Sequence, residues 1–348
     1  LLLIVVLLVV IGLVILYSTS AYNGQVKFHD SFYYLKKQAF ATVLGIVLML
    51  FVAGMDYHIW QRLAVFGYLA AVALSVAVML FGREINGSKR WLALGPFSFQ
   101  PSEFAKVALI LFLADLVTKN VKTIGKMWTL CRIMFWILPI VGLVGASNLS
   151  TAIIILGIGV ILIFVASPKY AQFALMGIAG ACFMGIFLAL ESYRLERLAI
   201  WRNPEKYEKG YQTLQGLYAI GSGGVFGVGI GNSVQKLGFV PEAQNDMIFS
   251  IICEELGLAG AGIIVFLFLL LIWRFFLIAS GSRDLFGALI ATGAMAHMMI
   301  QVILNIAVVT NTIPNTGITL PFISYGGTSV MFLLIEMGLV LSVSQVVD

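Results

Sequence analysis

Residues 247–272, MIFSIICEELGLAGAGIIVFLFLLLI, form an apolar run that only Glu254 and Glu255 interrupt. A run of this length is sufficient to cross the hydrocarbon core of a bilayer, which takes about 20 helical residues. Asp246 stands directly before it, where a polar loop ends, and an anion is costly to keep at a membrane boundary. The stretch therefore predicts a transmembrane helix and marks Asp246 as the leading functional candidate.

The composition of the whole chain places it in the same class. Of its 348 residues, 61% are hydrophobic and 11% are charged, with a mean hydropathy of +1.02, which is too apolar for a soluble domain. We predict an all-α polytopic integral membrane protein of about ten transmembrane helices, with a large extracellular loop between spans 7 and 8. The predicted spans are residues 1–18, 38–54, 60–81, 104–118, 128–146, 149–166, 170–190, 247–273, 285–309 and 322–346.

Lys and Arg in the short loops predict the orientation of these spans. One side carries slightly more of them and is taken as cytoplasmic, which places both termini inside. Cations on the outward side then violate the rule, as expected if some of them bind an anionic ligand. The run at residues 1–18 has no basic n-region and no cleavage site, so we expect a first span rather than a signal peptide.

The largest non-apolar segment, residues 191–246, is predicted to be a folded cap within a single domain that covers residues 1–348. Its basic and acidic residues balance, and it contains aromatic residues that a disordered linker seldom has. The glycines between Gly221 and Gly231 do not have nucleotide-binding spacing. They either form an anion-binding nest beside Lys236 or allow close packing of a re-entrant or interfacial segment.

A second polar cluster lies at residues 83–106, where Pro101 and Ser102 predict a helix start. Glu103 and Lys106 are three residues apart on that helix, so they share a face and can neutralise each other. They are either a structural pair or part of an anion site. In the second case, a pyrophosphate would be held by Arg83, Lys89, Arg90 and Lys106.

A third cluster, at residues 313–338, supplies neutral hydrogen-bonding groups suited to sugar hydroxyls, although packing would also select them. These groups are Thr316, Thr319, Ser324 and Tyr325. Glu336 follows in an apolar run and must pair, protonate or line a wet cavity. We expect His297 and Gln301, one turn apart, to form an interhelical hydrogen-bonding pair. The three cysteines and three histidines have neither disulfide-framework nor zinc-site spacing.

Three segments together resemble the SEDS family (shape, elongation, division and sporulation), of which FtsW, RodA and SpoVE are typical members. The segments are NGSKRWLALGPFSFQPSEFAK, YQTLQGLYAIGSGGVFGVGIGNSVQKLGFVPEAQNDMIFSIICEELG and NTGITLPFISYGGTSVMF. They occur in the family's order and spacing. The resemblance covers nearly the whole chain.

The resemblance implies a ten-span bundle that polymerises lipid II into glycan strands on the outer face of a bacterial plasma membrane. It also implies a class B penicillin-binding protein as partner, and no nucleic acid. The family's essential acid falls on Asp246, although Asn245 and Met247 stand where Thr and Phe are usual. Glu103 and Lys106 match the family's P-S-E-x-x-K motif, which implies a structural and activating pair. Asn148 replaces an Asp that is common in the family, so an acid at that position is not essential to the chemistry of this chain.

For this reaction we expect Asp246 to act as the general base toward the acceptor 4-hydroxyl group. Cations near Lys106, Arg83 and Arg90, or a divalent ion such as Mg²⁺ or Mn²⁺, would stabilise the departing pyrophosphate. Additional candidates for substrate contact are Lys89, Lys236, Glu242, Thr316 and Ser324. The alternatives are a lipid II flippase and a non-catalytic scaffold, and the role of Asp246 distinguishes all three.

Overall fold

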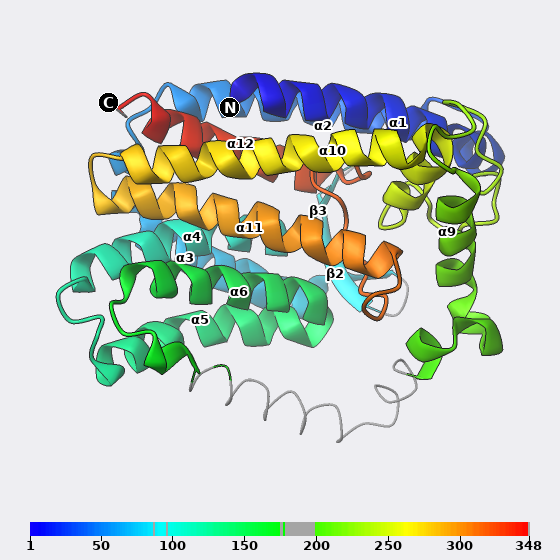
Figure 1. Cartoon of the computed structure of the whole chain (residues 1–348). Helices are drawn as coiled ribbons and strands as arrows, with labels where there is room; N and C mark the ends of the chain where they lie inside the picture. The colour runs from blue at the N-terminus through cyan, green and yellow to red at the C-terminus, as the bar shows by residue number, and fades with distance from the viewer. Residues whose placement is uncertain (86–87, 95–96, 175–176, 178–198, 347–348) are drawn as a thin grey trace.

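The computed structural model describes residues 1–85, 88–94, 97–174, 177 and 199–346, and long helices dominate it (Figure 1). The long helices of the described residues are α1 (Leu2–Phe28), α2 (Tyr33–Ala53), α3 (Tyr57–Phe81), α4 (Pro101–Asn120), α5 (Met127–Ser147), α6 (Leu149–Ala166), α10 (Ile248–Gly281), α11 (Leu285–Val309) and α12 (Gly327–Ser344). All of these except α4 make up the eight described helices that are long and apolar enough to cross a membrane. The predicted helical membrane fold is confirmed.

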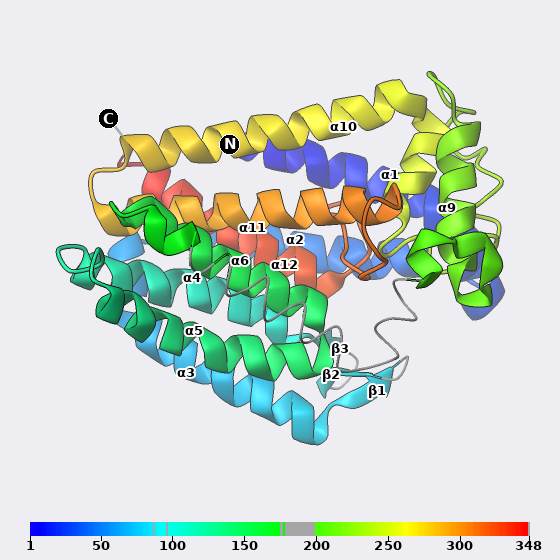
Figure 2. The same cartoon turned by 60° about the horizontal axis from the view of Figure 1, so that its bottom comes forward.

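Helix α4 runs with the other long helices although it carries both acidic and basic residues (Figures 1 and 2). It contains the predicted span 104–118, and its charged residues are Glu103, Lys106, Asp115 and Lys119. The predicted seventh span, residues 170–190, lies almost entirely outside the described residues.

Several helix bounds follow the sequence closely. Helices α6 and α11 occupy the predicted ranges, and the break before α6 falls at Asn148, whose side chain accepts a hydrogen bond from the Thr151 amide at 3.3 Å. Helix α1 instead continues ten residues past the predicted end at residue 18, to Phe28. Its added turns are polar, and they are stabilised because Asn23 and Lys27 bond to the segment before α10.

A small antiparallel sheet forms in the polar cluster before α4, where the sequence analysis predicted no strands. Its strands are β1 (Arg83–Ile85), β2 (Ser88–Leu94) and β3 (Phe97–Phe99), in that order. The sequence contains Asn86-Gly87 between the first two strands, a dipeptide that favours hairpin connections. The sheet lies at the end of the bundle that also carries α9 (Tyr211–Ser222) (Figures 1 and 2).

Helix α9 crosses this end of the bundle roughly perpendicular to the long helices (Figure 1). Two short 3₁₀ turns precede it, η1 (Pro204–Lys206) and η2 (Glu208–Gly210). A chain of turns follows it, from residue 223 to residue 247. The described part of the predicted cap therefore consists of α9 and the turns on either side of it.

Helix α10 is broken at Gly257, where we had predicted a continuous span. Gly257 has φ 68° and ψ −172°, a conformation that is essentially restricted to glycine. The glycine-rich chain bonds to both sides of the break: the Leu258 amide donates to Gly224 O, and the Val228 amide donates to Glu254 O, each at 2.9 Å. These bonds satisfy backbone groups that the break would otherwise leave unpaired in the bundle.

The glycine cluster after α9 makes this docking possible. A Cβ atom at Gly223 would lie 1.9 Å from Cys253 O, and one at Gly227 would lie 2.2 Å from Glu255 O. No side chain fits at such distances. Close packing is therefore confirmed at Gly223 and Gly227, whereas Gly221, Gly224 and Gly231 have open space around them.

Candidate functional site

A side chain of α11 fixes the position of Asp246. Asn305, which is fully buried on α11, donates hydrogen bonds from Nδ2 to the carbonyl oxygens of Asp246 at 2.8 Å and of Ile318 at 2.7 Å. One side chain thus fixes both the loop before α10 and the loop before α12. Sequence reasoning missed Asn305, although an isolated amide in an apolar helix is a recognisable signal.

The carboxylate of Asp246 faces α9 and the segment around Gly317. Gln212 on α9 donates to Asp246 Oδ1 at 3.4 Å, and Asn315 in turn donates to Gln212 Oε1 at 3.3 Å. A side chain placed at Gly317 would lie 3.9 Å from Asp246 Oδ2. The chain passes the Asp246 carboxylate at Gly317, whose φ of 68° is a backbone conformation that favours glycine.

The surroundings of Asp246 favour its protonated form more than water would. The pKa of Asp246 is raised to about 6, chiefly by burial and in part by the nearby Glu242 carboxylate. The backbone amide of Asp246 and the Gln212 amide act in the opposite direction. Such a carboxylate is mostly ionised at neutral pH and is a stronger base than an exposed aspartate.

Asp246 differs from every other buried carboxylate among the described residues. Six such groups are buried: Glu103, Asp115, Asp246, Glu254, Glu255 and Glu336. Each of the other five has a hydrogen-bond or ion-pair partner at 3.0 Å or closer. The side-chain partner of Asp246 is the Gln212 amide at 3.4 Å. Its lone pairs are therefore available to an incoming hydroxyl group.

Lys236 and Glu242 hold the chain around Asp246 against α1. The buried Lys236 ammonium lies 2.6 Å from Glu255 Oε1 and donates to Ser18 Oγ at 3.0 Å. Glu242 lies 3.2 Å from the Lys27 ammonium. Both residues thus have protein partners in this structure, and their contact with substrate stays a prediction.

Glu103 and Lys106 form the predicted pair on α4. The Lys106 ammonium lies 3.0 Å from Glu103 Oε1, and both side chains are buried. Lys106 also donates to Gln301 Oε1 at 3.4 Å, and Ser329 donates to Glu103 Oε2 at 3.0 Å. Contact between Lys106 and a phosphate would require the ammonium to leave these partners.

His297 and Glu336 extend this network. His297 Nε2 lies 2.8 Å from Gln301 Oε1, and His297 Nδ1 lies 2.8 Å from Glu336 Oε2. Since Gln301 Nε2 donates to Thr319 O at 3.0 Å, its Oε1 must accept, so His297 Nε2 carries a proton. His297 and Gln301 bond to each other within α11, and the predicted bonds between helices run instead from His297 to Glu336 of α12 and from Lys106 of α4 to Gln301.

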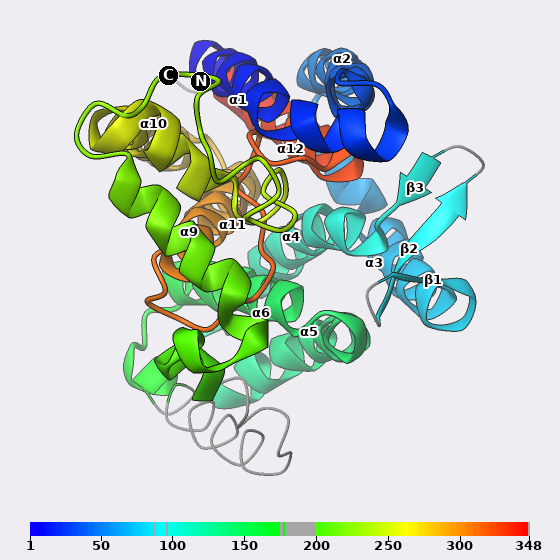
Figure 3. The same cartoon turned by 90° about the vertical axis from the view of Figure 1, so that its right-hand side faces the viewer.

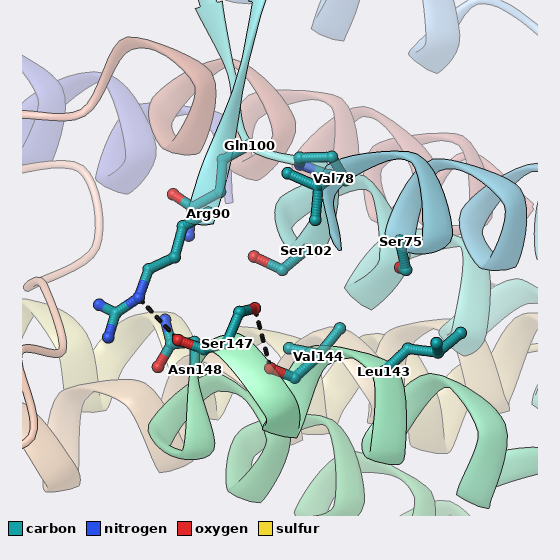
Figure 4. Close-up of a pocket in the computed structure, with 10 residues that line it drawn as sticks. Ser75, Val78, Arg90, Gln100, Ser102, Leu143, Val144, Ser147 and Asn148 are labelled. Atoms are coloured by element: carbon teal, nitrogen blue, oxygen red, sulfur yellow. Dashed lines mark hydrogen bonds between the residues drawn. The ribbon is translucent and has the colours of Figure 1, made fainter. Parts of the chain in front are cut away.

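The basic residues of the sheet lie elsewhere. Arg90 donates from Nε to Ser147 O at 2.9 Å and lines a small cavity with Gln100, Ser102 and Asn148 (Figure 4). Lys89 is exposed, and the Arg83 side chain lies outside the described residues. The structure therefore places Arg90 against the turn between α5 and α6, and joint binding of a pyrophosphate by these cations and Lys106 stays a prediction.

The turn between α5 and α6 connects Arg90 to the neighbourhood of Asp246. Ser147 binds Arg90, and Ser150, one turn later, donates to Thr316 O at 2.8 Å. Thr316 precedes Gly317, which borders the Asp246 carboxylate. Among the described residues the buried Thr316 hydroxyl has no hydrogen-bond partner. The Ser324 hydroxyl, by contrast, accepts from the Leu320 amide at 2.8 Å and stabilises its own loop.

A larger cavity, of about 460 Å³, opens at the opposite end of the bundle. Tyr57, His58 and Asp284 line it, and His58 Nε2 lies 3.2 Å from Asp284 Oδ2. It contains none of the residues that the sequence predicted for the site.

The fold and the site together define a polytopic membrane protein with a basic carboxylate buried at one end of its helix bundle. The family described as "Cell cycle protein", that of FtsW, RodA and SpoVE, matches residues 1–348. The chain belongs to this family, and the resemblance to SEDS proteins is confirmed.

The relatives are similar over almost their full length. Stage V sporulation protein E of Bacillus subtilis (strain 168) is 40% identical, with 99% of this chain and 96% of the relative covered. A probable peptidoglycan glycosyltransferase FtsW of Trichlorobacter lovleyi is 35% identical, with 99% and 92% covered.

Solved structures have the same fold. One chain of a peptidoglycan synthase complex, studied for its coordination of polymerization and crosslinking, superposes with a TM-score of 0.84 at 29% identity and covers 99% of this chain and 96% of its own. The rod shape determining protein RodA of Thermus thermophilus has a TM-score of 0.73 at 28% identity, with 99% and 95% covered.

Proposed function

We propose that this chain is a peptidoglycan glycosyltransferase that polymerises lipid II, with Asp246 as the general base. Family membership and relatives named as peptidoglycan glycosyltransferases support this activity. The observation that carries the role of Asp246 is that it alone, among the buried carboxylates of the described residues, has no side-chain partner closer than 3.4 Å. Its raised pKa, about 6, suits proton abstraction near neutral pH.

The proposed step is an inverting displacement. Asp246 takes the proton of the acceptor 4-hydroxyl while that oxygen attacks the anomeric carbon of the donor sugar. The new glycosidic bond forms as the bond to the lipid pyrophosphate breaks, and the pyrophosphate leaves with the electron pair. The configuration changes from α to β, and protonated Asp246 then releases its proton to water.

The departing pyrophosphate needs positive charge. Arg90 is the best placed of the proposed cations because the turn that binds it also contacts Thr316 beside the Asp246 site. Lys89 and Arg83 of the same sheet would add charge. Lys106 and Lys236 have carboxylate partners, so we assign them first to holding the fold.

We propose that a divalent ion takes part as a companion of the substrate and not as a protein-held cofactor. The described residues contain no group of three or more His, Cys, Asp or Glu side chains that could hold a metal ion. The proposed Mg²⁺ or Mn²⁺ would instead arrive as the counter-ion of the lipid pyrophosphate, since Mg²⁺ commonly binds through substrate phosphates. No step above depends on it.

For location and partner we propose the outer face of the bacterial plasma membrane and a class B penicillin-binding protein. The similarity to one chain of a peptidoglycan synthase complex supports a partner of this kind. The excess of basic residues in the loops opposite Asp246 supports a cytoplasmic location for both termini.

The test is polymerisation of labelled lipid II by the purified chain with its transpeptidase partner. We expect glycan polymer from the wild type and from Glu208→Gln, which changes an exposed carboxylate of the same cap, and none from Asp246→Ala. Polymer from Asp246→Ala at the wild-type rate would overturn the assignment. Lipid II translocation in vesicles without polymer would favour the flippase.

A further inference from the structure

The loop after α9 has a composition unusual for a segment exposed to water. Residues 224–239, GVFGVGIGNSVQKLGF, contain a single charged residue, Lys236, which is buried against Glu255. Apart from Asn232, the exposed side chains of its first part are apolar: Val225, Phe226, Val228, Ile230 and Val234. Phe226 is 85% exposed. Water-facing loops usually carry polar side chains, so this surface is matched to an apolar environment.

This loop is rigidly attached to a membrane-spanning helix. The Leu258 and Ala259 amides donate to Gly224 O and Val225 O at 2.9 and 3.0 Å. In the other direction, the Gly229 amide donates to Glu255 O at 2.9 Å. The apolar side chains are therefore presented at a fixed position beside α10.

The exposed surface of α10 continues the apolar surface of the loop. Beyond the break at Gly257, one exposed strip of large apolar side chains follows the helix: Leu258, Ile263, Phe266, Leu269 and Trp273. Large side chains of this kind, exposed on a spanning helix, face lipid. Because Leu258 bonds to Gly224, the strip and the loop form one continuous apolar surface.

The depth of the loop agrees with the edge of a bilayer. The part of α10 after Gly257, residues 258–281, rises about 36 Å, compared with a hydrocarbon core of about 30 Å. Its first residue, Leu258, therefore lies near one boundary of the core, and the loop bonds there. Seen end-on, the chain that leaves α9 passes around α10 at the periphery of the bundle (Figure 3).

Helix α1 indicates the same depth for the loop in the bilayer. A side chain at Gly238 would lie 3.6 Å from the Tyr22 ring, and α1 continues from Tyr22 to Phe28, a rise of about 9 Å. Val26 and Phe28, in these last turns, are exposed and apolar. The loop thus does not extend beyond the end of α1, whose last turns carry the exposed Val26 and Phe28 beside the polar Asn23 and Lys27, as at a membrane boundary.

We propose that residues 224–234 insert their apolar side chains into the lipid bilayer at the end of the bundle that carries Asp246. The partner of this surface is the boundary between lipid headgroups and acyl chains. Insertion fixes the depth of the loop in the membrane. Because the loop bonds to Glu254 and Glu255, insertion also fixes the depth of the nearby Asp246. The proposal concerns lipid contact and does not depend on the proposed enzymatic activity.

The experiment measures depth with a fluorophore. The full chain with Cys131, Cys182 and Cys253 replaced receives one new cysteine, at Phe226 or Ile230, labelled with an environment-sensitive dye. A matched control carries the dye at the exposed Glu208. In vesicles of phosphatidylethanolamine and phosphatidylglycerol, we expect blue-shifted emission and stronger quenching by lipid-borne nitroxide than by aqueous iodide at both loop positions. The control should show the reverse.

Quenching of the loop labels by iodide alone would overturn the proposal. So would labels that are exposed to iodide in the isolated chain and become shielded only when the transpeptidase is added, since that result identifies a protein-docking surface. Phe226→Asp and Phe226→Leu, each with the dye at Ile230, provide a second test. We expect Phe226→Asp to lose lipid quenching and Phe226→Leu to keep it, and equal quenching in the two variants would contradict insertion.

Discussion

Polymerisation should depend on a carboxylate that titrates near pH 6. Since burial raises the pKa of Asp246 to about 6, roughly nine tenths of the base is ionised at pH 7 and roughly one tenth at pH 5. The rate should therefore fall about tenfold between pH 7 and pH 5. An unperturbed aspartate would remain more than about nine tenths ionised at pH 5.

Two neighbours should move this acid limb in opposite directions. Glu242 raises the pKa of Asp246 by charge repulsion, so Glu242→Gln should shift the limb to lower pH. Gln212 lowers the pKa through its hydrogen bond, so Gln212→Leu should shift the limb to higher pH. Opposite shifts identify Asp246 as the titrating group.

Stability gives an independent measurement with a defined sign. A raised pKa means that the folded state binds the Asp246 proton more tightly than the unfolded state, so the folded state loses stability as pH rises from about 4 through about 6. The loss is at most about 3 kcal/mol. Asp246→Asn should therefore raise the unfolding temperature at pH 8 and leave it unchanged at pH 4.

The assay follows initial polymerisation rates of purified complexes from pH 5 to pH 8, with each variant confirmed as folded at each pH. The same samples provide the unfolding temperatures. A flat profile down to pH 5, or Asp246→Asn less stable than the wild type at pH 8, would refute the reasoning. Glu242→Gln and Gln212→Leu profiles shifted in the same direction would also refute it.

Three further predictions concern the bundle and the support of Asp246. Lys106→Met should destabilise the fold by about 3–5 kcal/mol because it leaves Glu103 charged and buried. In thermal unfolding, the double variant with Glu103→Gln should recover part of this loss. No recovery would mean that the pair is not coupled. Gly257→Ala should destabilise by at least about 1–3 kcal/mol through backbone strain, while Gly262→Ala, which meets no atoms within 4 Å, should be tolerated. Asn305→Leu should lower kcat with little change in KM, and a change in KM alone would contradict a positioning role.

The sequence predicted best where hydrophobicity alone determines structure. Helix α11 begins at the predicted residue because the Asp284 side chain caps its start by accepting a hydrogen bond from the Gly287 amide at 2.8 Å. It ends at the predicted residue because a polar segment follows Val309. The Glu103–Lys106 pair was also predictable, since residues three apart on a helix face each other.

The features that the sequence did not predict depend on contacts between distant segments. The break at Gly257 exists because residues 224–229 bond to its exposed amides and carbonyls, and hydropathy carries no information about such bonds. The last turns of α1 resemble a polar loop in the sequence, yet they are helical because Lys27 and Asn23 meet partners near residue 243. Asn305 likewise gains its role from two carbonyls that only the fold brings together.

The buried charges in the middle of the bundle explain why chemistry belongs at its end. From α4, Glu103 bonds to Ser329 of α12 and Lys106 bonds to Gln301 of α11. His297 of α11 bonds to Glu336 of α12, so each of the three helices is bonded to the other two. A translocation path through this region would have to separate α4, α11 and α12 and expose single charges to a low-dielectric interior, which costs several kcal/mol per ion. Asp246 can meet a hydroxyl without breaking a short contact, which favours a single site at this end of the bundle over a translocation path through its middle.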